Sequence, residues 1–166
     1  MDRHAALAVL KIALLTAASW TVITLVHECG HLVGGWLSGA TLVSCDLAPW
    51  RLPYSLHAPD PRPLVTLWCG PVIGSLAPFA AAAALRRRWA WFIADFCLLA
   101  NGVYLAAAWA TGDSQLDTAR LLAAGAHPAT IVIFCTSTIA VGYRRLRADF
   151  VQFWSGATTS KRTPGP

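Results

Sequence analysis

Three ionisable residues at fixed spacing, His27, Glu28 and His31, form an H-E-x-x-H pattern within an apolar stretch. Charged and imidazole groups are costly in such surroundings, so each needs a compensating interaction. On a helix, residues i and i+4 lie on nearly the same face, and two histidines placed this way can bind one metal ion. Glu28 is the only glutamate in the chain. It would lie beside that ion, where it could act as a general base toward water.

A metal-free alternative exists for the same three residues. Two histidines on one helix face can hydrogen-bond to neighbouring helices, and a buried glutamate can remain protonated. The metal interpretation is favoured because it gives all three groups a partner at once. It also gives a reason for placing the single glutamate of the chain inside the motif.

A third metal ligand must come from elsewhere in the chain, because a catalytic zinc ion takes three protein ligands and leaves one position for water. A third histidine at the metzincin position is excluded, since residue 37 is Leu37. A second glutamate does not exist, so the remaining oxygen ligands are aspartates. His57 and His127 are weaker nitrogen candidates.

Two aspartates follow the third apolar block, Asp113 and Asp117. If both termini lie on one side of a membrane, the end of the first block and the start of the fourth lie toward the opposite side. The histidine motif and these two aspartates can then come together there. Asp117 is the preferred ligand, because the helix-like sequence after it would hold its carboxylate on a rigid element, and Asp113 remains the alternative. Asn101, within the third block, could hydrogen-bond either to a substrate backbone or to a neighbouring helix.

The elements that must position these residues are apolar helices. Of the 166 residues, 56% are hydrophobic and only 13% are charged, which is typical of a membrane protein. The apolar residues form four blocks of sufficient length to cross a bilayer: 5–37, 64–85, 89–111 and about 119–143. We therefore expect an all-α polytopic membrane helical bundle with about four transmembrane helices.

The first block is followed by a polar insertion, residues 41–63, in which the alternation at 41–45 predicts a short strand or loop. Residues 1–150 are expected to form a single integral membrane domain. Residues 151–166 are rich in Ser, Thr, Gly, Lys and Pro toward their end and are expected to form a disordered polar tail.

The net charge of +5 comes from basic residues at the block ends, at 86–88 and 144–147. This distribution indicates membrane topology and not nucleic-acid binding. It predicts a multi-pass protein of the cell (inner) membrane with both termini in the cytoplasm. The expected partners are the lipid bilayer and a membrane-embedded protein or peptide substrate.

These motifs resemble the site-2 protease family of intramembrane zinc metalloproteases. His27, Glu28 and His31 match its H-E-x-x-H motif, and the sequence Leu-Asp-Thr-Ala-Arg-Leu at 116–121 is similar to its Leu-Asp-Gly motif, which supplies the third zinc ligand. Gly70-Pro71 with Gly74 is similar to a glycine-proline element on the family's middle helix. Thr118 replaces the usual glycine, and Asn101 lacks the proline that often follows it. The resemblance implies a minimal or divergent member without a PDZ domain.

The resulting functional hypothesis is a zinc-dependent intramembrane endopeptidase, in which a Zn²⁺-activated water attacks the peptide bond and Glu28 serves as general base. Two alternatives remain. One is a zinc-binding membrane pseudoprotease without turnover, and the other is a metal-free helical membrane scaffold.

Overall fold

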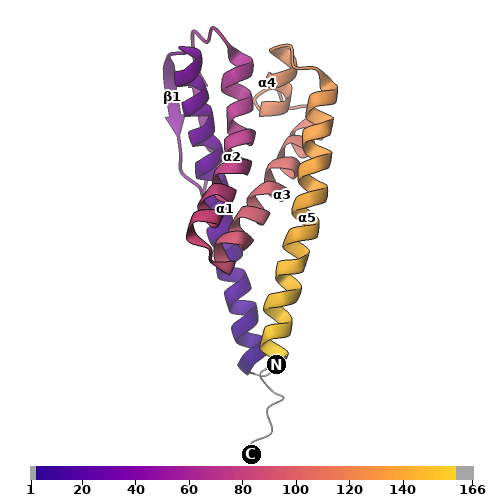
Figure 1. Ribbon diagram of the computed structural model, residues 1–166. Helices are drawn as coiled ribbons and strands as arrows, with labels where there is room; N and C mark the ends of the chain where they lie inside the picture. Colours follow the sequence, from indigo (N-terminus) through magenta and orange to yellow (C-terminus); the bar gives the residue numbers. More distant parts are fainter. Residues whose placement is uncertain (1–2, 160–166) are drawn as a thin grey trace, which may run out of the picture.

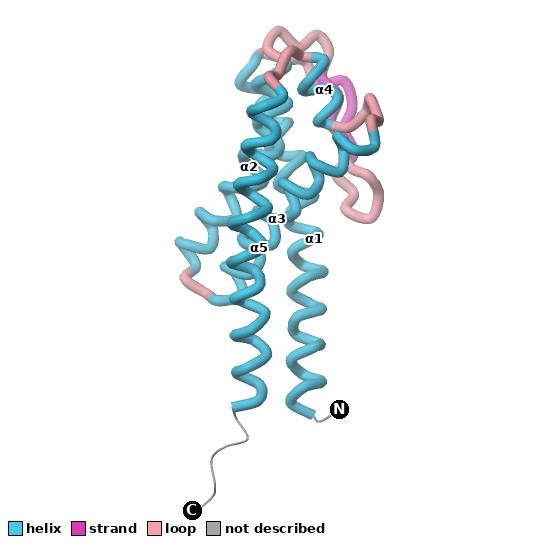
Figure 2. The backbone as a smooth tube through the Cα atoms, turned by 90° about the vertical axis from the view of Figure 1, so that its right-hand side faces the viewer, coloured by secondary structure: helices cyan, strands magenta, loops and turns pink. Residues whose placement is uncertain are grey.

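The computed structural model describes residues 3–159, and within this range the chain forms five helices and one two-stranded sheet. In chain order these are α1 (Arg3–Ser38), β1 (Leu42–Asp46), β2 (Tyr54–His57), α2 (Pro63–Leu85), α3 (Arg88–Thr111), α4 (Asp117–Ala123) and α5 (Pro128–Thr159). The helices form an elongated bundle, and α1 begins at the end of the bundle where α5 ends (Figures 1 and 2). The expectation of a helical bundle with a strand insertion after the first helix is confirmed.

Three helices in the described residues are long and apolar enough to cross a membrane: Ala5–Ser38, Pro63–Leu85 and Arg88–Thr111. The sequence predicts a fourth span over residues 119–143, and the structure divides this stretch. Gly125 has a positive φ of 93°, and Pro128 is the first residue of α5, so a short helix is separated from a long one. The apolar part of α5 ends before Arg144, and α5 is not among the three candidate spans.

The end of α5 also differs from the sequence-based expectation. The helix continues to Thr159, well into the segment 151–166 that was expected to be a disordered tail. Residues 160–166 of that segment lie outside the described part of the chain.

Close contact between α1 and α2 fixes the position of the histidine motif. A Cβ atom at Gly30 would collide with the carbonyl oxygen of Cys69, and one at Gly70 would collide with the ring of His31. The backbones can approach this closely only because both positions lack a side chain. The small residues identified in the sequence therefore bring α2 directly against the metal motif.

The strands β1 and β2 form an antiparallel hairpin in which Ser44 pairs with Leu56 and Asp46 pairs with Tyr54. This hairpin lies beside the second half of α1 (Figure 1). The β2 strand and the second half of α1 run in the same direction, because Ser55 contacts Glu28 and His57 contacts Gly35. The sequence predicts the first strand but not the second.

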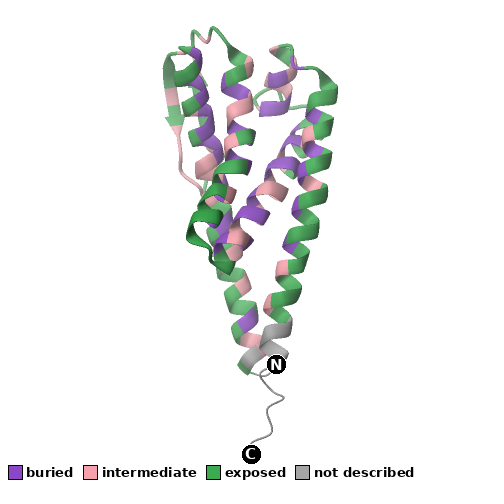
Figure 3. Ribbon diagram, viewed as in Figure 1, coloured by how far each residue is buried: buried purple, intermediate pink, exposed green. Residues whose placement is uncertain are grey.

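Buried residues are concentrated in the half of the bundle that carries the hairpin and α4, whereas the start of α1 and the end of α5 are largely exposed (Figure 3). Among the exposed residues at the start of α1 are large apolar side chains, including Leu7, Leu10 and Leu14. Exposed apolar residues on a helix of this length suit a lipid environment. The packed half of the bundle is where the candidate site lies.

Candidate metal centre

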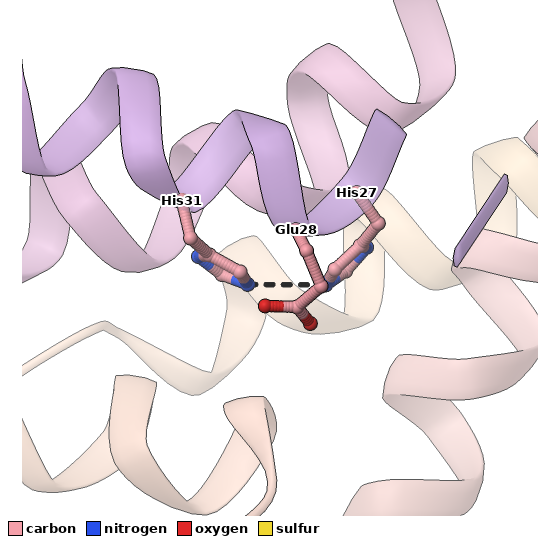
Figure 4. A group of neighbouring side chains, drawn as sticks. All are labelled: His27, Glu28 and His31. Carbon is pink, nitrogen blue, oxygen red and sulfur yellow. Dashed lines mark hydrogen bonds between the residues drawn. The ribbon is translucent and has the colours of Figure 1, made fainter. Parts of the chain in front are cut away.

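The three residues of the motif project from one face of α1, and Figure 4 shows the two imidazole rings on either side of Glu28. His27, Glu28 and His31 are all buried, and their ligand atoms lie within 4.8 Å of one another. The Nε2 atoms of the two histidines are 3.1 Å apart. The i and i+4 spacing therefore places both imidazoles as the sequence predicts.

Asp117, at the start of α4, completes the cluster. Its Oδ2 atom lies 2.8 Å from His27 Nε2 and 3.2 Å from His31 Nε2. Asp117 is buried, although it is separated from His27 by 90 residues in the chain. Two nitrogen atoms and one carboxylate oxygen thus form a small triangle inside the protein.

The other nitrogen of each imidazole fixes the tautomer of the ring. His31 Nδ1 lies 2.9 Å from the carbonyl oxygen of Thr66, which can only accept a hydrogen bond. His27 Nδ1 lies 2.8 Å from Asn101 Oδ1, while the amide nitrogen of Asn101 donates to the carbonyl oxygen of Cys97. Both Nδ1 atoms therefore carry the proton, and in the neutral rings both Nε2 atoms present a lone pair.

Three acceptor atoms consequently face one another with no donor between them. Such an arrangement requires a positive charge, either a proton on one imidazole or a metal ion. Zinc bonds of about 2.0–2.2 Å in a tetrahedral site place neighbouring ligand atoms roughly 3.3 Å apart. The observed separations of 2.8, 3.1 and 3.2 Å are close to this value. The donor set fits a tetrahedral metal with one open position.

Asp117 is held in this place by α4. Its neighbour Thr118 is fully buried and donates a hydrogen bond of 2.7 Å from Oγ1 to the carbonyl oxygen of Leu105 on α3. Thr118 thus ties the short helix to the bundle. Burial would raise the pKa of Asp117, but its hydrogen-bond contacts with the two imidazoles outweigh burial and hold the pKa well below its ordinary value. The Asp117 carboxyl group is therefore an anion at neutral pH.

Glu28 faces a cavity of about 290 Å³ that also contacts His31, Asp117 and β2. The hydroxyl of Ser55, on β2, donates a hydrogen bond of 3.2 Å to Glu28 Oε2. This bond keeps the carboxylate turned toward the cavity and beside the triangle of acceptor atoms. The arrangement provides a base, a metal-binding triangle and space for a ligand in one place.

Arg120 lies one turn after Asp117 on α4 and also lines this cavity. Its Nη1 atom is 4.0 Å from Asp117 Oδ1, the carboxylate oxygen that does not contact the histidines. Among the described residues that line the cavity, Arg120 is the only lysine or arginine. It supplies positive charge on the side of Asp117 away from the imidazoles.

The other ligand candidates are not brought to the cluster. Asp113 is exposed, and its Oδ1 accepts a hydrogen bond from the backbone N–H of Gln115. His57 packs against Gly35, and the exposed His127 accepts a hydrogen bond from the backbone N–H of Ala129. Of the two aspartates left open by the sequence, only Asp117 reaches the histidines.

Asn101, the candidate for substrate binding, is only 1% exposed, and its amide group bonds to His27 and to the backbone of Cys97. It also lines a smaller cavity of about 140 Å³ beside His27. In the structure its side chain thus orients a histidine. The helix-contact interpretation of Asn101 agrees with these bonds.

Two contributors to the site carry no signal in the sequence. Thr66 acts through its backbone carbonyl, which every residue type possesses. Ser55 reaches Glu28 from a strand that the sequence does not predict. Both contacts depend on the packing of α2 and of the hairpin against α1, which local sequence patterns do not reveal.

Comparison of the chain with protein-family models, with curated proteins and with solved structures found no match. Functional inference therefore depends on the geometry of the site itself.

Proposed function

We propose that the protein is a zinc-dependent endopeptidase that hydrolyses peptide bonds of membrane-associated substrates, as the resemblance to site-2 proteases implies. The observation that carries this proposal is the triangle formed by His27, His31 and Asp117. Its three acceptor atoms converge with both tautomers fixed. Two imidazole nitrogens and one carboxylate oxygen form a donor set that suits Zn²⁺.

A zinc ion in this site would polarise a substrate carbonyl and acidify a water molecule. Glu28 is placed to take the proton, because its carboxylate lies beside the triangle and faces the cavity. Ser55 holds this carboxylate in orientation, and Glu28 can later pass the proton to the leaving amine. Arg120 adds a positive charge to the cavity wall, which favours negative charge developing on the substrate.

The hairpin offers a binding mode for an extended peptide. Residues 54–56 of β2 line the cavity, and within the described residues β2 pairs with another strand only on the side of β1. An unpaired strand edge can add main-chain hydrogen bonds to a peptide. Non-helical backbone at membrane depth is tolerated where it lines a water-containing cavity, which agrees with this role.

The membrane setting is part of the proposal. Three apolar helices are long enough to span, and Arg145 of α5 pairs with Asp95 of α3 close to the basic segment 86–88. Clustered basic residues favour the cytoplasmic side. Because α5 ends at the end of the bundle where α1 begins, its apolar part would provide a fourth crossing. In this account the protein is a multi-pass protein of the cell (inner) membrane with both termini in the cytoplasm, and its substrate is a membrane-embedded protein or peptide.

The test compares wild type with Glu28→Gln, both purified in detergent and loaded with zinc. The probe is a library of quenched-fluorescent peptides with randomised central residues and apolar flanks. Wild type should cleave, and Glu28→Gln should lose about 10²–10⁴-fold in rate while it keeps its zinc. Zinc-loaded wild type that cleaves no faster than Glu28→Gln would contradict the proposal and favour a zinc-binding protein without turnover.

A further inference from the structure

A second, smaller cavity is also lined by Glu28. It has a volume of about 140 Å³ and is formed by α1, α3 and the loop that joins β1 to β2. Most of the wall surface of this cavity is apolar, and its apolar lining residues are Trp20 and Ile23 of α1, Leu52 and Pro53 of the loop, and Ala100 of α3. Its polar lining residues are His27 and Glu28 of the candidate metal centre, together with Thr24, Arg51, Asn101 and Tyr104.

The two cavities meet at shared residues. Glu28, Tyr104, Leu52 and Pro53 line both of them. The ring of Tyr104 packs edge-on against His27, with 5.4 Å between the ring centroids. If a peptide bond is held beside Glu28 in the larger cavity, the side chain of an adjacent substrate residue can therefore reach into the smaller cavity.

The size of the smaller cavity limits what can fill it. A dry apolar cavity of about 150 Å³ in a protein accommodates a molecule such as benzene. A space of 140 Å³ with mostly apolar walls suits a leucine or phenylalanine side chain.

We propose that this cavity is a specificity pocket that binds a branched aliphatic or aromatic side chain of the substrate residue next to the cleaved bond. The inference rests on the proposed peptidase function and adds to it a preference for one substrate class. Ile23 and Thr24 belong to the α1 wall of the pocket, so a larger side chain at either position would reduce the space for a substrate side chain.

Direct binding tests this pocket without a known substrate. The probes are N-acetyl-glycine, N-acetyl-leucine and N-acetyl-phenylalanine hydroxamates, because a hydroxamate binds zinc and the three differ only in one side chain. Their Kd values are measured by calorimetry on the zinc-loaded, full-length protein in detergent. On wild type, the leucine and phenylalanine compounds should bind about 10- to 100-fold more tightly than the glycine compound.

Two matched variants test whether the difference in Kd between the hydroxamates arises in this pocket. Thr24 lines the pocket, and its hydroxyl bonds only within α1, to the carbonyl oxygens of Trp20 and Thr21. Thr24→Leu should fill the pocket, so the Kd values of the three compounds should then differ by less than about threefold. Thr21 is exposed on the same helix and does not line the pocket, so Thr21→Leu should keep the wild-type difference.

The outcomes separate this inference from the proposed function. Bound zinc with equal Kd values for all three hydroxamates on wild type would overturn the pocket and leave the metal centre intact, as expected if a lipid chain fills the space. An unchanged side-chain preference in Thr24→Leu that still binds zinc would also overturn it. Wild type that binds neither zinc nor any hydroxamate would overturn both proposals.

Discussion

Two groups of ionisable residues lie in different parts of the bundle, and their charges are balanced in different ways. In the first, His27, His31 and Asp117 converge as three acceptor atoms. In the second, which we call the arginine cluster, Asp95 and Asp149 lie beside Arg145. The Arg145 Nε atom donates a hydrogen bond of 2.5 Å to Asp95 Oδ1.

The arginine cluster contains its own positive charge. The guanidinium of Arg145 lies 5.3 Å from the ring centre of Phe79 and 5.5 Å from that of Trp91, so aromatic faces also stabilise it. The histidine cluster has no such cation between its three acceptors. The arginine cluster therefore carries its own counter-charge, whereas the three acceptors of the histidine cluster need a proton on one imidazole or a metal ion between them.

The largest expected effect is on metal binding at the histidine cluster. His31→Ala removes one of two imidazole ligands and should abolish stoichiometric zinc binding, measured by mass spectrometry of the detergent-purified protein. His127→Ala is the matched control, since His127 is exposed and outside the cluster, and it should retain zinc. If His31→Ala and His127→Ala bind the same amount of zinc per chain, the histidine cluster is not the metal site.

An intermediate effect is expected from the residue that orients His27. Asn101→Ala removes the acceptor for the His27 Nδ1–H bond and should weaken zinc affinity about 10- to 100-fold in competition with a chelator. Asn101→Asp keeps a hydrogen-bond acceptor for His27 at this position, so its zinc affinity should fall less than that of Asn101→Ala. If the two variants bind zinc equally, Asn101 does not act through this hydrogen bond.

The smallest effect is expected in the arginine cluster and concerns stability. Burial and the neighbouring carboxylate of Asp95 raise the pKa of Asp149 to about 6. A raised pKa means that the folded state binds the proton more tightly, so stability should fall as pH rises from about 4 to above 6. Because Asp149 is only partly buried, we expect a loss of about 1 kcal/mol after solvent screening.

Asp149→Asn should remove this pH dependence and leave zinc binding unchanged. The measurement is the thermal midpoint at pH 5 and at pH 7.5 for wild type and the variant. One oxygen of Asp149 is buried without a hydrogen-bond partner, which is consistent with a cost of ionisation there. A wild-type midpoint that rises between these pH values would contradict the assigned direction.

Local sequence signals predicted the parts of the site that lie on one helix. The H-E-x-x-H spacing fixed the geometry of His27, Glu28 and His31, because i and i+4 positions share a helix face in any context. Glycines at positions 30 and 70 allow a close approach of α1 and α2, which the structure shows. An argument from topology narrowed the aspartates to Asp113 and Asp117, and the helix-like sequence after Asp117 favoured that residue. Only Asp117 reaches the histidines.

Features that depend on packing could not be read from the sequence. The roles of Thr66 and Ser55 arise from α2 and β2 lying against α1. By contrast, the division of residues 119–143 had a local signal, because Gly125 suits the end of a short helix and Pro128 the start of the next. Thr118 donates a hydrogen bond to the carbonyl oxygen of Leu105 on α3, which composition does not indicate.

The central claim is that His27, His31 and Asp117 form a metal site, and zinc content tests it most directly. Wild type, Asp117→Ala and Asp113→Ala are purified in parallel, and zinc per chain is measured by mass spectrometry. We predict about one zinc ion per chain in wild type and in Asp113→Ala, and a loss of zinc in Asp117→Ala. Wild type that binds no metal, or Asp117→Ala that binds zinc as wild type does, would contradict the account.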